Sequence, residues 1–173
     1  MNRVDYFKGL VRDSRDFFEG TLHDVTPEQA AWVPAGRALP IAAQYAHVVA
    51  AQDFGLHGLL LGSAPLALGP WSGRTGMAEL PPAFGEPWDG WAKQPFDLLA
   101  LRAYARAVYD ASDAYLARLD EAEMARTVDL TAAGFGEQTV GFVLVNGWVM
   151  NVNLHCGEIA CLKGLQAAKG YPV

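Results

Sequence analysis

Apolar residues recur at helical spacing in four separate segments of this 173-residue chain. Bulky side chains fall close to a 3.6-residue period within residues 4–18, 41–61, 95–119 and 138–168. No stretch between these segments alternates apolar and polar residues over the length of a typical strand. Helices with one apolar face must bury it against one another. The sequence therefore predicts one all-α domain, residues 1–173, built as a four-helix bundle.

Residues that begin or end helices stand near the edges of these segments. The run Thr26-Pro27-Glu28-Gln29 offers a hydroxyl cap, a proline at the first helical position and a glutamine three residues after the cap, so a short helical turn is predicted there. Gly62 is expected to end the second long helix, and Pro95 to open the third. Gly170 is expected to close the fourth, with Pro172 beyond it.

The segment 62–93, between the second and third long helices, is rich in proline, glycine and tryptophan. It holds five of the ten prolines and three of the five tryptophans, which disfavours regular helix or strand. A loop of this length is uncommon inside a compact domain and usually serves as a functional lid or an interface cover. We expect its aromatic residues to pin it to the bundle: Trp71, Phe84, Trp88 and Trp91.

The charge balance argues against nucleic acids as partners. The chain has 13 Lys and Arg against 19 Asp and Glu, a net charge of -6, and it contains no basic cluster that could bind phosphates. The longest apolar stretch, residues 140–154, is interrupted by Asn146, Asn151 and Asn153 and is too short for a membrane span. We therefore expect no membrane association.

The apolar content and the cysteines suggest where the protein works and how it assembles. Hydrophobic residues make up 51% of the chain and charged residues only 18%, an excess that favours a buried interface and predicts a homodimer. Cys156 and Cys161 are five residues apart in a predicted helix, on opposite sides, so they should not pair with each other. Residues 1–18 lack the apolar run of a secretory leader, and we expect a cytoplasmic protein.

Two histidines lie inside predicted apolar helices. His47 and His155 should both face inward, and a buried imidazole without a partner costs about 1–3 kcal/mol. Asn151 lies four residues before His155 and shares its face, and Trp148 and Glu158 extend this column by three residues at either end. Such a column indicates either a functional site or a structural hydrogen-bond network, and spacing does not separate the two.

The remaining histidines and the cysteines are interpreted as outside the site. His23 follows the first helix near a turn, and His57 lies about 80° around the helix from His47. Cys156 and Cys161 are interpreted as small apolar residues. Cys156 adjoins His155 in sequence, but neighbours in a helix point about 100° apart, so adjacency does not make a catalytic dyad.

Four stretches resemble the DinB-like (DinB/YfiT) family of four-helix-bundle metalloenzymes. The end of the fourth helix, NVNLHCGEIACLKGLQ, looks like the family's C-terminal signature around its last metal-binding histidine. The earlier TPEQAAWVPAG and IAAQYAHVVAAQDF resemble its Trp-x-Pro turn and the helix that carries the first metal-binding histidine. WDGWAKQPFDLLALRAYARAVYDASDAYLARL is similar to its third helix, so the resemblance spans nearly the whole chain.

The resemblance implies a divalent metal, zinc or nickel, held by three residues that match His47, Asn151 and His155. An amide oxygen is a poorer ligand for these ions than imidazole or carboxylate. The site could accordingly bind a metal weakly, recruit Glu158, or have lost the ion and kept a polar pocket. Family members include thiol-dependent transferases and isomerases, in which the metal acidifies a thiol or a water.

Three functions follow from these readings. The first is a metal-dependent enzyme, a transferase, isomerase or hydrolase acting on a small molecule or with a low-molecular-weight thiol, with His47 and His155 as ligands. The second is a metal-free protein that binds a small apolar ligand beneath the loop 62–93. The third is a dimeric bundle in which the histidines and Asn151 only complete a structural network.

Overall fold

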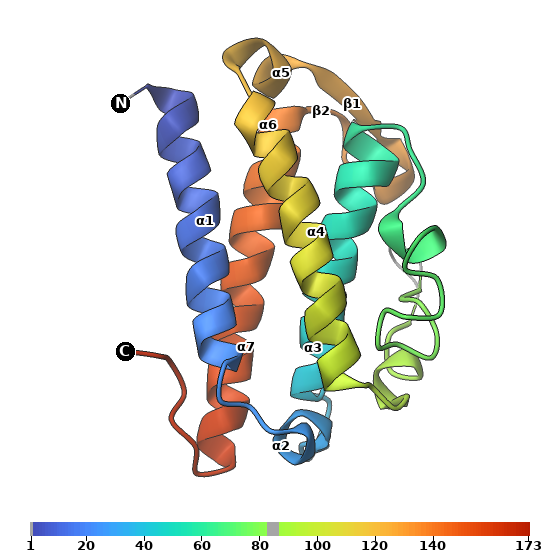
Figure 1. The fold of residues 1–173 in the computed structure, drawn as a ribbon, viewed down its shortest axis with the longest axis vertical. Helices are drawn as coiled ribbons and strands as arrows, with labels where there is room; N and C mark the ends of the chain where they lie inside the picture. Colours follow the sequence, from blue (N-terminus) through green and yellow to red (C-terminus); the bar gives the residue numbers. More distant parts are fainter. Residues whose placement is uncertain (1, 83–86) are drawn as a thin grey trace.

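The computed structural model describes residues 2–82 and 87–173, and it is predominantly helical. Its long helical segments lie side by side along the longest axis (Figure 1). They are α1 (Arg3–Leu22); α3 (Ile41–Asp53) continued by the π-helix η1 (Phe54–Leu60); α4 (Leu98–Arg118); and α6 (Val140–Leu144), the π-helix η5 (Val145–Met150) and α7 (Asn151–Leu165) in one run. α1 packs against α7, α7 against α3, and α3 against α4.

Short polar side chains begin several helices by accepting hydrogen bonds from the first free backbone N–H groups. Thr26 and Gln29 form the predicted reciprocal cap at the start of α2 (Pro27–Ala31). The predicted role of Pro95 is wrong, because α4 begins three residues later. There the Asp97 carboxylate accepts from the N–H groups of Leu99 and Ala100 at 3.0 Å each.

The end of the last helix also differs from the prediction. α7 stops at Leu165, five residues before Gly170, and Ala167 adopts the left-handed backbone conformation with φ of 58°. Gly170 instead allows the tail to approach α7, since a Cβ there would lie 3.1 Å from the Ala160 carbonyl oxygen. Gly62, with φ of 61°, follows η1 as predicted.

A small antiparallel hairpin interrupts the helical architecture between α4 and α6. After α5 (Glu121–Ala125), strand β1 (Thr127–Leu130) pairs with β2 (Gly136–Thr139) across the turn η4 (Thr131–Ala133). The sequence did not predict this sheet. Each strand has only four residues, and β1 and β2 together bury a single apolar side chain, Val128, so the alternation is too short to recognise.

Two clusters of buried side chains form the core. The first contains Tyr45, Leu101, Tyr104 and Ile159, and the second, at the hairpin end, contains Leu116, Leu144 and Trp148. Burying an aliphatic or aromatic side chain of this size contributes about 1.5–3 kcal/mol. Both clusters draw on α3–η1 and on the α6–η5–α7 run, and these two runs therefore span both halves of the molecule.

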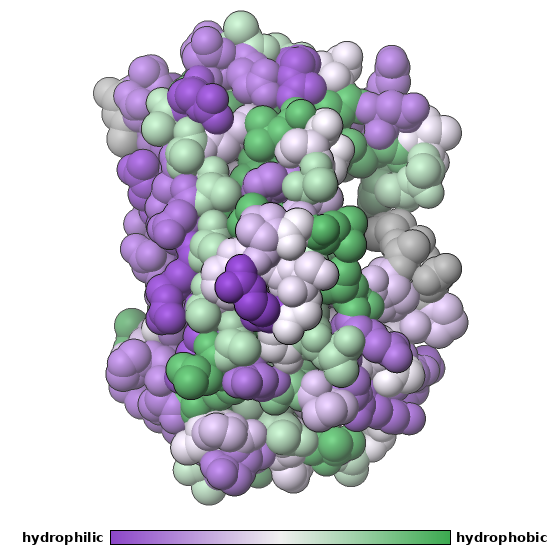
Figure 2. Space-filling view, turned by 45° about the vertical axis from the view of Figure 1, so that its right-hand side comes forward, coloured by the Kyte–Doolittle hydropathy of each residue, from purple (hydrophilic) through white to green (hydrophobic). Residues whose placement is uncertain are grey.

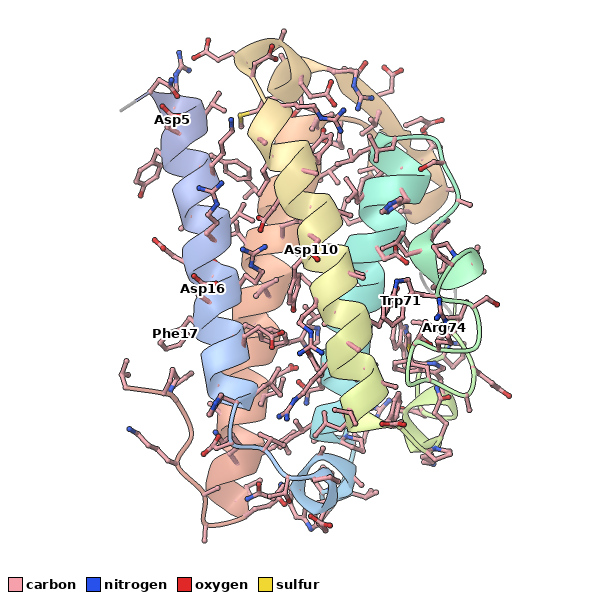
Figure 3. The ribbon with its side chains drawn as sticks, viewed as in Figure 1. Asp5, Asp16, Phe17, Trp71, Arg74 and Asp110 are labelled. Carbon is pink, nitrogen blue, oxygen red and sulfur yellow. The ribbon has the colours of Figure 1, made fainter. Side chains whose placement is uncertain are left out.

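The proline-rich loop packs against the first cluster, and its short 3₁₀ turns are η2 (Leu66–Leu68) and η3 (Trp91–Lys93). Trp91 is buried, and the Trp71 ring lies 5.9 Å from that of Tyr104 (Figure 3). Trp88 packs against the same cluster, whereas Phe84 lies outside the described residues. The described tryptophans thus attach the loop to the helices, as predicted.

A buried carboxylate fixes the root of this loop. Asp53, at the end of α3, has no exposed surface. Its two oxygens accept hydrogen bonds from the N–H groups of Leu66 and Ala67 at 2.9 Å and from the Tyr104 hydroxyl at 2.7 Å. Because a buried charge needs such donors, Asp53 ties the loop to α3 and α4 together.

Two further expectations concern membranes and disulfides. Among the described residues, none of the helices combines the length and the apolarity that a membrane span requires. Both cysteines are free, with Cys156 buried and Cys161 exposed, as their spacing predicted.

The space-filling view shows hydrophobic side chains beside hydrophilic ones on the face over α4 and the loop (Figure 2).

Candidate functional site

The packing of α3 against α7 brings two of the predicted site residues together. The rings of His47 and His155 have centroids 4.8 Å apart and planes inclined at 73°, an edge-to-face contact. Both side chains are partly buried. Two imidazoles at this separation, one from each helix, can both bind one ion or one small chemical group that lies between them.

Asn151 joins the pair from the first residue of α7. A side-chain hydrogen bond with Asn151 favours the protonated form of His47, but burial and the neighbouring His155 outweigh it and lower the pKa of His47 to about 4. His47 is therefore neutral near pH 7 and has a nitrogen lone pair to offer. Its Nδ1 is buried and makes no hydrogen bond within the described part of the chain.

His155 is oriented by a carboxylate on its own helix. Its Nδ1 lies 2.7 Å from Glu158 Oε2 and 3.4 Å from Gln44 Oε1. A donor at Nδ1 satisfies the carboxylate, which leaves Nε2 as the lone-pair nitrogen. Carboxylates hold metal-binding histidines in this way, and Glu158 occupies that place here.

The loop covers the histidine pair with an aromatic ring. Trp88 packs edge-to-face on His47 with centroids 4.4 Å apart, and it contacts Trp91 at 5.1 Å. The Trp91 indole N–H donates to the Glu79 carbonyl oxygen at 2.9 Å and so holds this part of the loop in place. The Trp88 ring is thus part of the surroundings that bury His47, and this burial lowers the pKa of His47.

Several residues of the predicted column do not join the site. Trp148 is buried in the second core cluster, where its ring lies 6.1 Å from that of Tyr115. The column fails at this point because η5 is π-helical and changes the angular spacing just before Asn151. His23 is exposed, and His57 lies 3.1 Å from Asp53, away from the pair. Both histidines were predicted to lie outside the site.

Gln44 is a site residue that the sequence reasoning missed. It is buried on α3, three residues before His47, and its amide donates to the Leu39 carbonyl oxygen at 3.1 Å while its oxygen faces His155. The available signal was an amide side chain one helical turn before His47, in a helix made mostly of apolar residues. Trp88 could have been placed only from the path of the loop.

The donor set is incomplete if only the strongest metal ligands are counted. Across residues 2–82 and 87–173, no three His, Cys, Asp or Glu side chains converge in a way that suits a metal ion. An ion between His47 and His155 would therefore need Asn151, or a moved Glu158, as its third protein ligand.

Fold and site together define a helical protein with a paired-histidine centre between two of its helices. The profile of the DinB superfamily matches residues 10–159, and the chain belongs to that superfamily. The crystal structure of a conserved protein from Enterococcus faecalis is similar, with a TM-score of 0.76 and 21% identity over 95% of this chain and 97% of that chain. At this identity the similarity shows a shared fold. No curated protein matches the sequence.

Proposed function

We propose that this protein is a metal-dependent enzyme of the DinB superfamily, with α1, α3, α4 and α7 as a four-helix bundle. In this proposal a divalent ion, zinc or nickel, binds to His47, His155 and Asn151. The observation that carries it is the contact of two imidazoles at 4.8 Å, one of which is tied to a carboxylate through Nδ1.

The residues present suit such an ion. His47 is held neutral, and its buried Nδ1 has no hydrogen-bond partner in the described part of the chain, while the Glu158 contact leaves a lone pair on His155. Asn151 adds a neutral amide oxygen, a weaker donor than a carboxylate, so we expect a modest affinity. A divalent ion bound here would lower the pKa of a coordinated water or thiol.

The chain's own residues would prepare the site for that chemistry. Gln44 and Glu158 orient His155, and Trp88 keeps water away from His47. Glu158 is exposed, with 58% of its side chain accessible, so it can also exchange a proton with solvent or substrate. We propose a small molecule or a low-molecular-weight thiol as substrate, in a transferase, isomerase or hydrolase reaction.

Calorimetric titration of tag-free, chelator-treated protein with zinc and with nickel tests the proposal. We expect one ion per chain, loss of binding in His47→Ala and His155→Ala, and no change in the control His23→Ala, an exposed histidine. Asn151→His should tighten binding because imidazole is the better donor. Binding that survives both His47→Ala and His155→Ala, or absence of binding in both wild type and Asn151→His, would contradict the site.

A metal-free ligand-binding protein is the second candidate, and the packing of Trp88 on His47 favours it. A dry, neutral imidazole under an indole suits a small apolar ligand as well as an ion. In that case Asn151→His should bind no metal and should lower the free energy of unfolding by about 1–3 kcal/mol, because it mispairs a buried group. Thermal melts of the variant with and without zinc separate the two functions.

We also propose a homodimer, since large apolar side chains remain exposed on the long helices. Leu99 is 78% exposed, Leu154 65% and Leu165 66%. Apolar surface of this kind commonly serves assembly. Sedimentation velocity at micromolar concentration should give the mass of two chains, and a single monomeric species there would contradict this assembly.

A further inference from the structure

A second polar centre lies on the opposite side of α3 from His47. A cavity of about 800 Å³ opens between α1 and α4, and Tyr45 of α3 contributes to its lining. Tyr45 and His47 are two residues apart, so their side chains leave the helix about 200° apart. The cavity is therefore distinct from the paired-histidine centre, and its volume lies within the usual range for small-molecule sites.

A carboxylate lines this cavity. Glu19 of α1 accepts a hydrogen bond from the Tyr109 hydroxyl at 2.6 Å and another from the Tyr45 hydroxyl at 3.4 Å. Burial raises the pKa of Glu19, an effect that these hydroxyls and Arg102 oppose. An ionised carboxylate has about four acceptor positions, and the two tyrosines use only two. Glu19 can thus accept further donors from a molecule in the cavity.

Four Lys and Arg side chains line the same cavity, and among the described residues only Lys163 forms an ion pair, with Asp24. Arg102 donates to the carbonyl oxygens of Leu22 at 2.7 Å and Val25 at 3.2 Å, so it is engaged at the end of α1. Arg106 and Lys169 also line the cavity, yet neither forms an ion pair with any residue the structure describes. Lys169 Nζ donates only a long hydrogen bond, of 3.5 Å, to the Pro172 carbonyl oxygen, so both side chains can contact an anionic group.

The C-terminal tail forms one wall of the cavity. Tyr171 packs on Phe17 with ring centroids 5.5 Å apart, and Phe17 points from α1 toward the tail (Figure 3). Pro172 packs closely on Gly20, since a Cβ at Gly20 would lie only 3.2 Å from the proline ring. The absence of a side chain at Gly20 permits this approach. The tail thus carries Lys169 and an aromatic surface to the cavity.

We propose that this cavity binds a small zwitterion of the amino-acid or short-peptide type. Its ammonium group donates to Glu19, its carboxylate contacts Arg106 and Lys169, and its apolar part lies against the tyrosines. A ligand with both charges fits better than a simple anion, which Glu19 would repel, or a simple amine, which would leave the cations unpaired. The proposal is independent of any metal at His47.

Three matched probes test it: L-phenylalanine, 2-phenylethylamine and 3-phenylpropanoate, which share a phenyl group and differ in their charges. Binding to the full chain is measured by calorimetry and by saturation-transfer NMR. We expect phenylalanine to bind most tightly. Glu19→Gln should weaken phenylalanine and phenylethylamine by about tenfold or more without weakening phenylpropanoate, because a charge-assisted hydrogen bond is lost.

Arg106→Gln provides the second variant, since Arg106 is exposed and its loss should not disturb folding. It should weaken phenylalanine and phenylpropanoate but not phenylethylamine, and Arg12→Gln, an exposed arginine elsewhere on α1, should weaken none of them. His47→Ala should leave all three affinities unchanged, which separates this cavity from the proposed metal centre. No binding of any probe at millimolar concentration, or equal effects of Arg106→Gln and Arg12→Gln, would overturn the proposal.

Discussion

Two histidine–carboxylate pairs occur on the helices of this protein, and their surroundings differ. His57 Nδ1 lies 3.1 Å from Asp53 Oδ1, and the Asp53 side chain has no exposed surface. His155 Nδ1 lies 2.7 Å from Glu158 Oε2, and the Glu158 side chain is 58% exposed. Each pair lies within one turn of helix, so sequence spacing alone would treat them alike.

The two carboxylates are used to different extents. Asp53 also accepts three hydrogen bonds, from two loop N–H groups and a tyrosine hydroxyl. Among the described residues, Glu158 hydrogen-bonds only to His155. Beside each carboxylate one buried histidine nitrogen, Nδ1 of His57 or of His47, makes no hydrogen bond within the same residues. Asp53, which accepts three hydrogen bonds, holds the fold together, whereas the free acceptor positions of the exposed Glu158 are available to a ligand.

Removing the saturated carboxylate should have the largest effect. We expect Asp53→Ala to lower the free energy of unfolding by about 3–5 kcal/mol, because two backbone N–H groups and a tyrosine hydroxyl lose the carboxylate that accepts from them. Urea denaturation followed by circular dichroism measures this. The control is Asp110→Ala, on the outer side of α4 (Figure 3), which should stay within about 0.5 kcal/mol of wild type. Equal losses in both variants would remove the distinction between the pairs.

The pH dependence of stability should report the burial of His47. Its folded-state pKa is about 4, below the ordinary 6.5, so between these values the unfolded chain binds more protons and stability falls as the pH is lowered. The loss should be on the order of 1–3 kcal/mol. Urea melts from pH 7 to pH 4 with chelator present should show it.

His47→Asn is the matched variant for this measurement. The difference between the two proteins cancels the titration of other groups, such as Glu19, whose raised pKa acts in the opposite direction. We expect the variant to lose less stability than wild type over this pH range. Parallel pH profiles would mean that His47 is not desolvated in the folded protein.

Glu158→Gln should have the smallest effect on stability and a selective effect on binding. The exposed pair contributes at most about 1 kcal/mol, so the unfolding free energy should hardly change. Zinc affinity should nevertheless fall by roughly tenfold, because the amide orients His155 less firmly. Calorimetric titration of Glu158→Gln and of the exposed control Glu121→Gln makes the comparison, and an unchanged affinity would assign Glu158 to the surface alone.

Sequence patterns were sufficient for the long helices and for the meeting of His47 with His155. Apolar spacing determines which helix faces are buried, and both histidines lie on such faces of helices that pack together. The helix cap at Thr26 could also be predicted, because it depends only on residues close together in the sequence. Local chemistry and periodicity thus account for the elements and for the two imidazoles at the centre of the candidate site.

The features of the fold and site that were not predicted depend mostly on contacts between residues far apart in the sequence. Asp53 meets Leu66, Ala67 and Tyr104 across separations of 13, 14 and 51 residues, which no local pattern reveals. Trp88 reaches His47 through the path of an irregular loop. The predicted position of Trp148 was wrong for another reason, because the prediction assumed an uninterrupted α-helix where the structure has the π-helix η5.

The two π-helices have a consequence for how this chain can vary. Leu60, at the end of η1, and Leu144, just before η5, belong to the second core cluster at the hairpin end, whereas Val49 before η1 and Cys156 after η5 belong to the first. One residue turns an α-helix by about 100°, and a π-helical turn accommodates one extra residue without that rotation, so η5 keeps Trp148 in its cluster while Asn151 and His155 face α3. The length of this helix is thus restricted to values that keep both halves in phase, whatever residues fill it.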